Sequence, residues 1–169
     1  MLPIKTEISQ LRKRLAQVST SKILDDHKAS VIFYTKILPT LMRVERCTIF
    51  IMEIGSNRIC SMFGTGLDEM RIVPPMEGSV VGRVISTGKS VIDNDLTSHQ
   101  GYHLQIAEQT GFACHSMLCS PIRGKDDDQI FGAVQLLNKT DRGAFSEDDR
   151  LQLEEVAYIL STSIKSTVF

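Results

Sequence analysis

The residues of this chain that could do chemistry are few, and their spacing matches no familiar catalytic or metal-binding motif. The four cysteines, at positions 47, 60, 114 and 119, include no C-x-x-C pair and lack the spacing of a disulfide framework or a zinc site. His99 and His103 are four residues apart, but no acidic residue or cysteine accompanies them at metal-ligand spacing. We therefore expect reduced and mostly buried cysteines, no metal, and a surface or lid role for the two histidines.

Signatures of hydrolysis and of nucleotide transfer are missing from the sequence as well. It contains no Walker loop, G-x-S-x-G elbow, H-E-x-x-H pair or kinase signature, and Gly64-Thr65-Gly66 lacks the third glycine of a dinucleotide-binding loop. We therefore expect a protein that is not an enzyme and needs no cofactor.

Composition and charge narrow the possible partners. The 169 residues are 42% apolar and 23% charged, which is typical of one globular domain with a sizeable core. A net charge of -1 gives no general attraction to nucleic acid or to anionic lipid. No apolar run approaches the ~20 residues of a membrane span, and the N-terminus lacks the apolar stretch of a signal peptide. The expected location is cytoplasmic, with neither nucleic acid nor membrane as a partner.

Two helices are predicted before the first strand. Residues 1–25 should form a lead-in helix, because apolar residues alternate at steps of four and three over Ile4, Ile8, Leu11, Leu15 and Val18. The domain itself should occupy residues 26–169. Its first helix should begin near Asp25 or Asp26, and Pro39 should end or kink it.

Strand-forming residues follow. Residues 47–54 and 58–63 are rich in β-formers and flank a turn at residues 55–57, which predicts a hairpin. A further short strand is expected at residues 70–73, closed by two prolines.

Residues 78–112 should cover a site. Residues 78–88 have helical spacing, a serine to cap the start and a glycine to end it, and a strand follows at 89–92. Residues 93–112 are polar, with at most one or two helical turns around Leu104 and Ile106, and loops this long usually bind or cover a ligand. The helix start at Ser79 would offer free N–H groups to a phosphate, and Phe63 could stack on a purine.

The last third of the chain completes an α+β pattern. Residues 115–122 and 129–137 read as two strands joined by an acidic turn. Ser146, with Asp149 three residues later, can cap a final helix, whose apolar face comprises Leu153, Val156, Ala157, Leu160 and Ile164. The two terminal helices present more apolar surface than one side of a sheet should absorb, so we expect a homodimer.

Several motifs occur in a distinctive order along residues 26–165. They are Gly78-x-x-x-Gly82 with Ser86-Thr87-Gly88-Lys89, then Thr110-Gly111-Phe112, Met117-Leu118-Cys119-x-Pro121-Ile122, the run from Gly132 to Lys139, and Phe145-x-x-x-Asp149. In this order the chain resembles a GAF domain, most closely the regulatory GAF domains of cyclic-nucleotide phosphodiesterases and cyanobacterial adenylyl cyclases. The resemblance implies a PAS-related, six-stranded antiparallel sheet, with the terminal helices on one face and a ligand pocket on the other.

The same resemblance implies a set of ligand contacts. Alignment with members that bind cyclic AMP or cyclic GMP places these contacts on Thr48, Phe63, Gly64, Val81, His103, Ala107, Thr110, Cys114 and Gln135. The departures are Gly64 and Ala107, where binding members can carry acids, and Cys114, where a second threonine can sit.

A structural signature of the family is also matched in part. Asn138, Lys139, Phe145 and Asp149 fit it, whereas Arg150 replaces a glutamate. The resemblance implies an ion pair between Lys139 and Asp149 that supports the pocket. The alternative is that Asn138 and Lys139 merely end a strand and Asp149 merely caps a helix.

These observations favour a regulatory domain that senses a small molecule, first of all a cyclic nucleotide. The alternative is an interaction module that keeps the fold for dimerisation and binds no ligand. Reduction of free methionine sulfoxide is disfavoured, because Cys114 and Cys119 are five residues apart and would point to opposite faces of one strand. A bilin or haem sensor is disfavoured too, because Cys114 and His115 lie at the start of a strand rather than in a helix.

Overall fold

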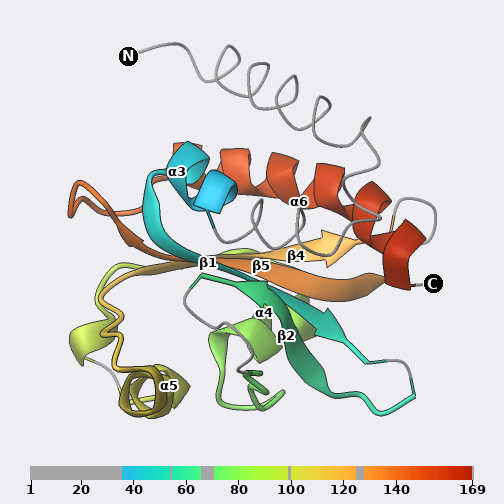
Figure 1. Cartoon of the computed structure of the whole chain (residues 1–169), viewed down its shortest axis with the longest axis horizontal. Coiled ribbons are helices and arrows are strands. Elements are labelled where there is room, and N and C mark those ends of the chain that lie inside the picture. Colours follow the sequence, from blue (N-terminus) through green and yellow to red (C-terminus); the bar gives the residue numbers. More distant parts are fainter. Residues whose placement is uncertain (1–35, 54, 66–70, 99, 125–127, 169) are drawn as a thin grey trace.

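An antiparallel sheet divides the molecule into two layers (Figure 1). The computed structural model describes residues 36–53, 55–65, 71–98, 100–124 and 128–168, without the side chains of Phe63 and of residues 162–168. Within these ranges the sheet has five strands in the order β2-β1-β5-β4-β3. Their bounds are β1 Val44–Met52, β2 Ile59–Gly64, β3 Val91–Asp93, β4 Met117–Arg123 and β5 Ile130–Lys139.

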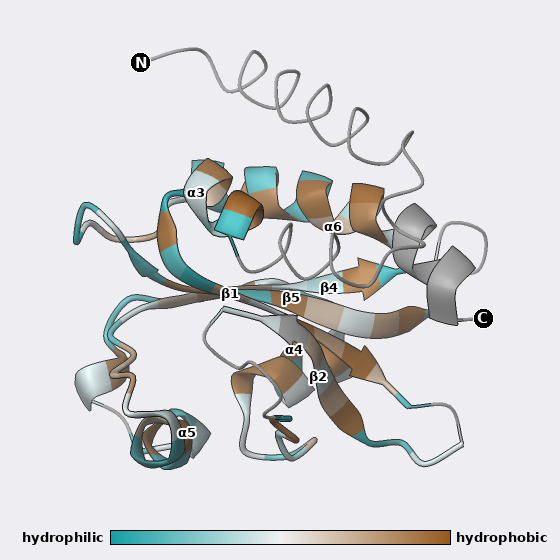
Figure 2. Ribbon diagram, in the orientation of Figure 1, coloured by the Kyte–Doolittle hydropathy of each residue, from teal (hydrophilic) through white to brown (hydrophobic). Residues whose placement is uncertain are grey.

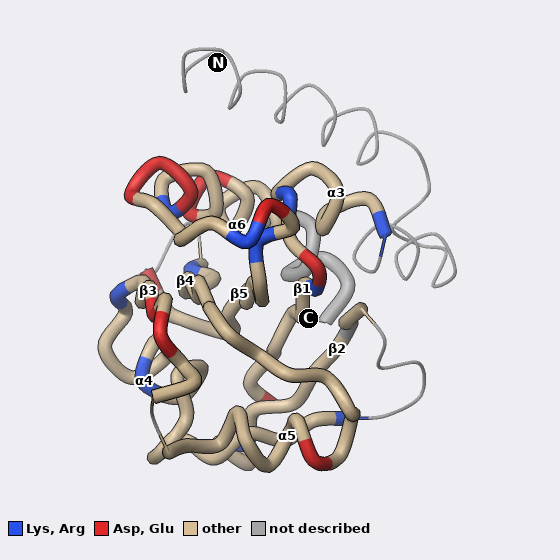
Figure 3. The backbone as a smooth tube through the Cα atoms, turned by 90° about the vertical axis from the view of Figure 1, so that its left-hand side faces the viewer, with Lys and Arg blue, Asp and Glu red and all other residues tan. Residues whose placement is uncertain are grey.

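Helices cover both faces of the sheet. The helices α3 (Leu38–Met42) and α6 (Glu147–Val168) lie on one face, and α4 (Val80–Thr87) and α5 (Tyr102–Thr110) lie on the other (Figure 1). A short 3-10 helix, Leu96–Ser98, precedes α5. Among the described residues no helix is long and apolar enough to cross a membrane. Charges of both signs are scattered over the molecule (Figure 3), in keeping with its small net charge.

The core consists of two apolar clusters, one on each side of the sheet. Brown segments of α6 and α4 in Figure 2 face the strands from opposite sides. On the α6 side, Leu153, Val156 and Leu160 pack against residues such as Ile49 and Leu136. On the α4 side, a smaller cluster joins α4 to the sheet; it includes Phe50, Val81, Val84, Cys119 and Ala133. The central strands are therefore buried on both faces, which explains their nearly continuous apolar runs.

Local signals were reliable for several elements. The hairpin of β1 and β2 is confirmed, with Gly55 and Asn57 in left-handed conformations at its turn. The helix α4 is confirmed with its caps: Ser79 Oγ accepts the Gly82 N–H at 2.9 Å, and Gly88 ends the helix in a left-handed conformation. Around α6, Ser146 Oγ accepts the Asp149 N–H and the Asp149 carboxylate accepts the Ser146 N–H, which is a capping box.

Pro39 does not end the first helix. It occupies the first turn of α3, a position that tolerates proline, and the left-handed Arg43 ends the helix instead. A kink at Pro39, the other expectation, would involve residues before Lys36, which lie outside the described part of the chain. The lead-in helix predicted for residues 1–25 and the helix start near Asp25 lie outside the described residues.

The expected sixth strand at residues 70–73 does not form in the described residues. The Ser61 N–H donates to the Ile72 carbonyl at 2.8 Å, but the Ile72 N–H donates to the Ser61 hydroxyl, also at 2.8 Å. The side chain thus replaces the backbone acceptor, and the prolines that follow have no N–H to continue a ladder.

The helical content of the segment before Phe112 is larger than the expected one or two turns. The helix α5 has nine residues, preceded by the 3-10 turn, so the cover of this face is more regular than the polar sequence indicated.

We predict that Gly82→Ala destabilises the domain. A Cβ at this position of α4 would collide with the backbone carbonyl of Met76, which cannot swing aside as a side chain would. Overpacking of this kind costs about 1–3 kcal/mol in the free energy of unfolding, measurable by urea denaturation. Gln105→Ala, at an exposed position of α5, should change the stability by ~0.5 kcal/mol or less. Equal stability of Gly82→Ala and the wild type would contradict the close packing of α4 on residue 76.

Candidate functional site

A cavity of about 510 Å³ lies between the sheet and its cover of α4 and α5. This volume falls within the range of small-molecule pockets, roughly 300–1,000 Å³. Alternate residues of β1 contribute Arg46, Thr48 and Phe50 to its floor, because side chains of a strand point to one face at every second position. Across the sheet, Thr48 pairs with Gln135, which also lines the cavity.

Six of the nine sequence-predicted contact residues meet around this cavity. They are Thr48, Val81, His103, Thr110, Cys114 and Gln135. Gly64 and Ala107 do not belong to its described lining. On α5 the lining residues His103, Ile106 and Thr110 share one helical face, and Ala107 is turned about 100° away from Ile106. Phe63 lies in β2 opposite Ile49, but its side chain is outside the described part of the chain.

Several lining residues were missed by sequence reasoning. The most informative are Arg46, Tyr102 and Phe112. Arg46 carried a usable signal, since it precedes Thr48 by two residues on the same strand. The positions of Tyr102 and Phe112 depend on how α5 folds back over the sheet, which no local pattern indicates.

The cover is fixed by side-chain hydrogen bonds at the ends of its helices. Ser79 Oγ donates to the Pro75 carbonyl at 2.6 Å while it caps α4, and Tyr102 donates its hydroxyl to the Val73 carbonyl at 3.1 Å. The helix α5 ends at Gly111 in a left-handed conformation, which turns the chain toward Phe112. Phe112 then lies 3.8 Å from the Arg46 guanidinium, measured to the ring centre.

Polar groups in the cavity wall are incompletely satisfied. His103 Nε2 is buried and has no hydrogen-bond partner among the described residues. The Gln135 amide donates to the Met117 sulfur at 3.1 Å, and a thioether is a weak acceptor. At the start of α4, the first-turn N–H groups of Val80 and Val81 have no acceptor within the helix. A bound molecule with suitable acceptors and donors would give partners to the Gln135 amide and to the first N–H groups of α4.

Burial favours the protonated form of the Cys114 and Cys119 thiols. Cys114 lines the cavity, and burial, followed by the nearby Asp93 and Glu45 carboxylates, raises the pKa of its thiol to about 12. Burial also raises the pKa of the Cys119 thiol. At neutral pH both stay protonated, and a neutral thiol is a poor nucleophile. The expectation that both lie on one strand was wrong, because β4 begins at Met117, after Cys114.

Asn138 holds the wall segment that carries Cys114. Its side-chain oxygen accepts the N–H groups of His115 at 2.7 Å and Ser116 at 3.2 Å. Its amide group donates to the Ala113 carbonyl at 3.0 Å and to the Glu45 carboxylate at 2.9 Å. Asn138 has a left-handed backbone, which asparagine tolerates better than most residues. This residue therefore does more than end β5.

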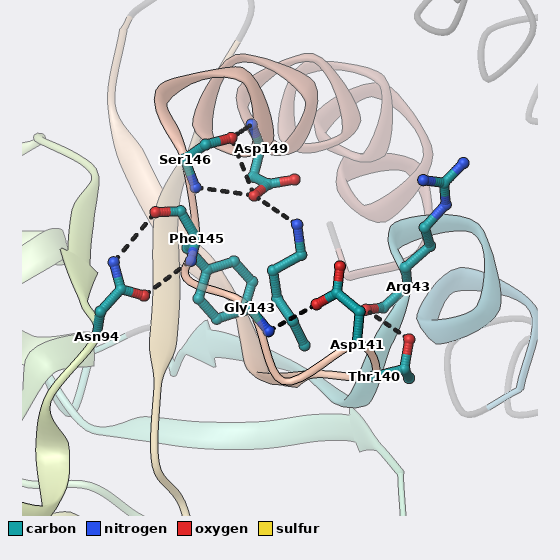
Figure 4. A network of polar contacts seen from close by, with 9 residues as sticks. Arg43, Asn94, Thr140, Asp141, Gly143, Phe145, Ser146 and Asp149 are labelled. Atoms are coloured by element: carbon teal, nitrogen blue, oxygen red, sulfur yellow. Dashed lines mark hydrogen bonds and ion pairs between the residues drawn. The ribbon is translucent and has the colours of Figure 1, made fainter. Parts of the chain in front are cut away.

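The ion pair implied by the resemblance is present next to it. Lys139 Nζ lies 3.0 Å from Asp149 Oδ2, and their side chains are only 15% and 16% exposed. The same oxygen accepts the Ser146 N–H at 2.8 Å and the Ser146 hydroxyl at 3.1 Å (Figure 4). Asn94, just after β3, donates to the Phe145 carbonyl and accepts the Phe145 N–H (Figure 4).

Arg150, which departs from the family signature, has its own partners. It contacts Glu147 and Glu154 on α6, each at 2.7 Å. Glu154 also accepts the Ser90 hydroxyl at 2.8 Å. The substitution thus joins a polar cluster between α6 and the segment that leads into β3.

No group of three or more possible metal ligands occurs within the described ranges. His103 lies in the cavity wall, whereas His99, its candidate partner in the sequence, is outside these ranges.

The sequence is similar to that of known proteins. The family model described as GAF domain matches residues 34–164. A dual 3',5'-cyclic-AMP and -GMP phosphodiesterase 11A of Takifugu rubripes is 28% identical over 126 residues, which cover 68% of this chain and 14% of the relative. A phosphodiesterase 11 of Drosophila melanogaster is 29% identical over 82 residues, or 48% of this chain and 5% of its own. The chain therefore spans a small part of these relatives.

Solved structures share the fold at low sequence identity. The GAF domain of an Acinetobacter phosphoenolpyruvate-protein phosphotransferase superposes with a TM-score of 0.76 and 20% identity, over 99% of this chain and 96% of that one. Free methionine-R-sulfoxide reductase from Neisseria meningitidis, solved with its substrate, gives a TM-score of 0.67 and 20% identity, over 95% and 91%. At such identities the likeness concerns the fold alone.

A double-mutant cycle on Lys139→Ala and Asp149→Ala should show coupling. Each change leaves a partly buried charge without its partner, so we expect each to cost about 2 kcal/mol or more and the coupling to reach ~1 kcal/mol. Denaturant unfolding of the four proteins measures both quantities.

The matched control is the exposed pair of Arg123 and Asp128, whose side chains are 40% and 82% exposed. Its cycle should give a coupling near zero, as exposed pairs usually do. Similar couplings in the two cycles would mean that the Lys139 pair is no more than a surface contact.

Proposed function

Because this chain belongs to the GAF domain family, as the match over residues 34–164 shows, we propose that it is a regulatory domain that senses a small molecule. We propose further that the ligand is a purine cyclic nucleotide, cyclic AMP or cyclic GMP. The observation that carries the proposal is the cavity of about 510 Å³, with the polar side chains of Thr48, His103 and Gln135 in its wall. A few polar groups placed in a mostly apolar wall fix the orientation of a small ligand and provide specificity.

The chemistry of the wall supports this class of ligand. Apolar side chains such as Ile72, Leu96 and Ile106 offer surface to a flat ring. Gln135 can both donate and accept, as recognition of a purine edge requires. The start of α4 supplies N–H groups and the positive end of a helix dipole, which favour a phosphate. The two phosphodiesterase relatives are named for cyclic AMP and cyclic GMP, which supports the same choice.

Reduction of methionine sulfoxide has less support. Two neighbours in fold carry that activity in their names, but they share no more than 20% identity with this chain. The raised pKa of the Cys114 thiol argues against a reactive thiolate at this position.

Titration calorimetry of the wild type with cyclic AMP and cyclic GMP tests the proposal. We expect saturable binding of at least one nucleotide, and a higher melting temperature in its presence, because a ligand of the native state stabilises it by about 2.7 kcal/mol at 100 times Kd. Gln135→Leu should weaken binding about tenfold, since it removes a hydrogen-bonding edge at nearly constant volume.

Gln109→Leu, on the exposed side of α5 and outside the cavity lining, is the control and should bind as the wild type does. Absence of heat and of a thermal shift up to millimolar nucleotide would reject the sensing function and favour the interaction-module alternative.

We also propose that the domain forms a homodimer through its terminal helices. Leu153, Val156 and Leu160 cannot contribute to such an interface, contrary to the expectation from the sequence, because they are buried against the domain's own sheet. Among the described side chains of α6, the large apolar ones that remain exposed are Leu151 and Tyr158, at 44% and 55%; they lie seven residues, or two turns, apart. The apolar seam in the sequence of residues 4–18 has the matching repeat of seven residues.

Light scattering at tens of micromolar should give about twice the 18.9 kDa of one chain. Two double variants, Leu11→Asp with Leu15→Asp and Leu151→Asp with Tyr158→Asp, should both give monomers, because charge at an apolar interface is strongly disfavoured. Leu104→Asp, at a leucine on α5 that is 39% exposed, should stay dimeric. A monomeric wild type would refute the dimer.

A further inference from the structure

Arg46 carries a positive charge into the cavity without an ion-pair partner among the described residues. Its side chain lines the cavity, and its guanidinium lies on the Phe112 ring at 3.8 Å. No hydrogen bond or ion pair joins that guanidinium to another residue in the described part of the chain. A guanidinium has five N–H donors and no acceptor, so all of its hydrogen-bonding capacity is available.

The neighbouring carboxylates form no ion pair with Arg46. Glu45, next to it in β1, acts on Arg46 through its charge, but the Glu45 carboxylate accepts the Asn138 amide at 2.9 Å. Asp93 lies in the same cross-strand row, which runs from Arg46 through Leu137 and Met117. Three strand spacings separate their backbones, which amounts to about 14 Å.

The guanidinium is also held in place and partly shielded from water. Gly111 directs the chain so that Phe112 covers it, and an arginine stacked on a ring keeps its plane fixed. Burial lowers the pKa of Arg46, which indicates a charged group that has lost solvation. The Glu45 charge and the Phe112 ring offset part of that loss, and a ligand acceptor within hydrogen-bond distance would offset more.

The register of the sheet places Arg46 away from α4. The helix α4 packs over Phe50 and Ala133, and Arg46 is four residues from Phe50 on β1. Four residues of a strand span about 14 Å. A ligand that fills the cavity therefore has one end near the start of α4 and another near Arg46.

We propose that Arg46 selects the ligand, by donating two parallel hydrogen bonds to a pair of acceptors that carries no competing donor. This inference rests on the proposed sensing function and deepens it. Two parts of a purine cyclic nucleotide present such a pair: the O6 and N7 edge of guanine, and two oxygens of the cyclic phosphate. The adenine edge presents an amino group at the equivalent place, and a guanidinium cannot pair with it because both groups are hydrogen-bond donors.

Calorimetry with cyclic GMP, cyclic AMP and guanosine tests which part of the ligand Arg46 binds. The variants are Arg46→Gln and Arg46→Lys, with Arg58→Gln as the control. Arg58 is exposed in the hairpin turn and does not line the cavity. If Arg46 reads guanine, Arg46→Gln weakens cyclic GMP and guanosine at least tenfold and spares cyclic AMP. If it holds the phosphate, cyclic GMP and cyclic AMP weaken and guanosine is spared. In the phosphate case Arg46→Lys retains part of the affinity, because charge survives without the planar fork.

Equal weakening of all three compounds, or binding within twofold of the wild type, overturns the role of Arg46. Melting temperatures show that each variant is folded, and if Arg46→Gln does not fold, Arg46→Lys decides alone. If the wild type binds none of the three compounds, the proposed cyclic-nucleotide function fails, and inorganic phosphate becomes the probe at constant ionic strength. A thermal shift with phosphate that Arg46→Gln abolishes then supports the anion-selecting role, and equal shifts in the two proteins overturn it.

Discussion

Two neighbouring residues at the end of β5 hold the two layers of this molecule together. Lys139 binds the Asp149 carboxylate and so sets where α6 begins, which places the apolar side of that helix on the sheet. Asn138 binds the backbone on both sides of Cys114 and so sets the cavity wall. Because a buried ion pair and a fully bonded amide each have one good geometry, both layers are placed from the same two residues.

One face of the sheet packs against α6, and the other face forms the floor of the cavity. In β1, Cys47, Ile49 and Ile51 belong to the cluster under α6, whereas Arg46, Thr48 and Phe50 line the cavity. Since the two sets alternate, a slip of one residue in the pairing with β5 would exchange them. The apolar set opposes such a slip, because it would move three buried side chains out of the core. Packing on the α6 side thereby maintains the positions of polar groups on the other side.

The sequence predicted best what short-range chemistry decides. Ser79, Gly88 and the Ser146–Asp149 pair give local capping signals, and each helix end lies where they indicate. It predicted less well what depends on distant contacts. Residues 71–73 are strand-like by composition, but the Ser61 hydroxyl takes the place of a backbone acceptor. Arg46 and Phe112 are far apart in the chain, and only the return of the chain after α5 brings them together.

The two hydrogen bonds between Asn94 and Phe145 have a mechanical consequence. Asn94 begins the segment that covers the cavity, and Phe145 immediately precedes the capping serine of α6. Because the Asn94 amide bonds both the N–H and the carbonyl of Phe145, the two segments can move little relative to each other. If a ligand displaces the segment that begins at Asn94, either these two hydrogen bonds break or the first turn of α6 moves with that segment. The first turn of α6 is consequently the place where strain from an occupied cavity would be transmitted across the sheet.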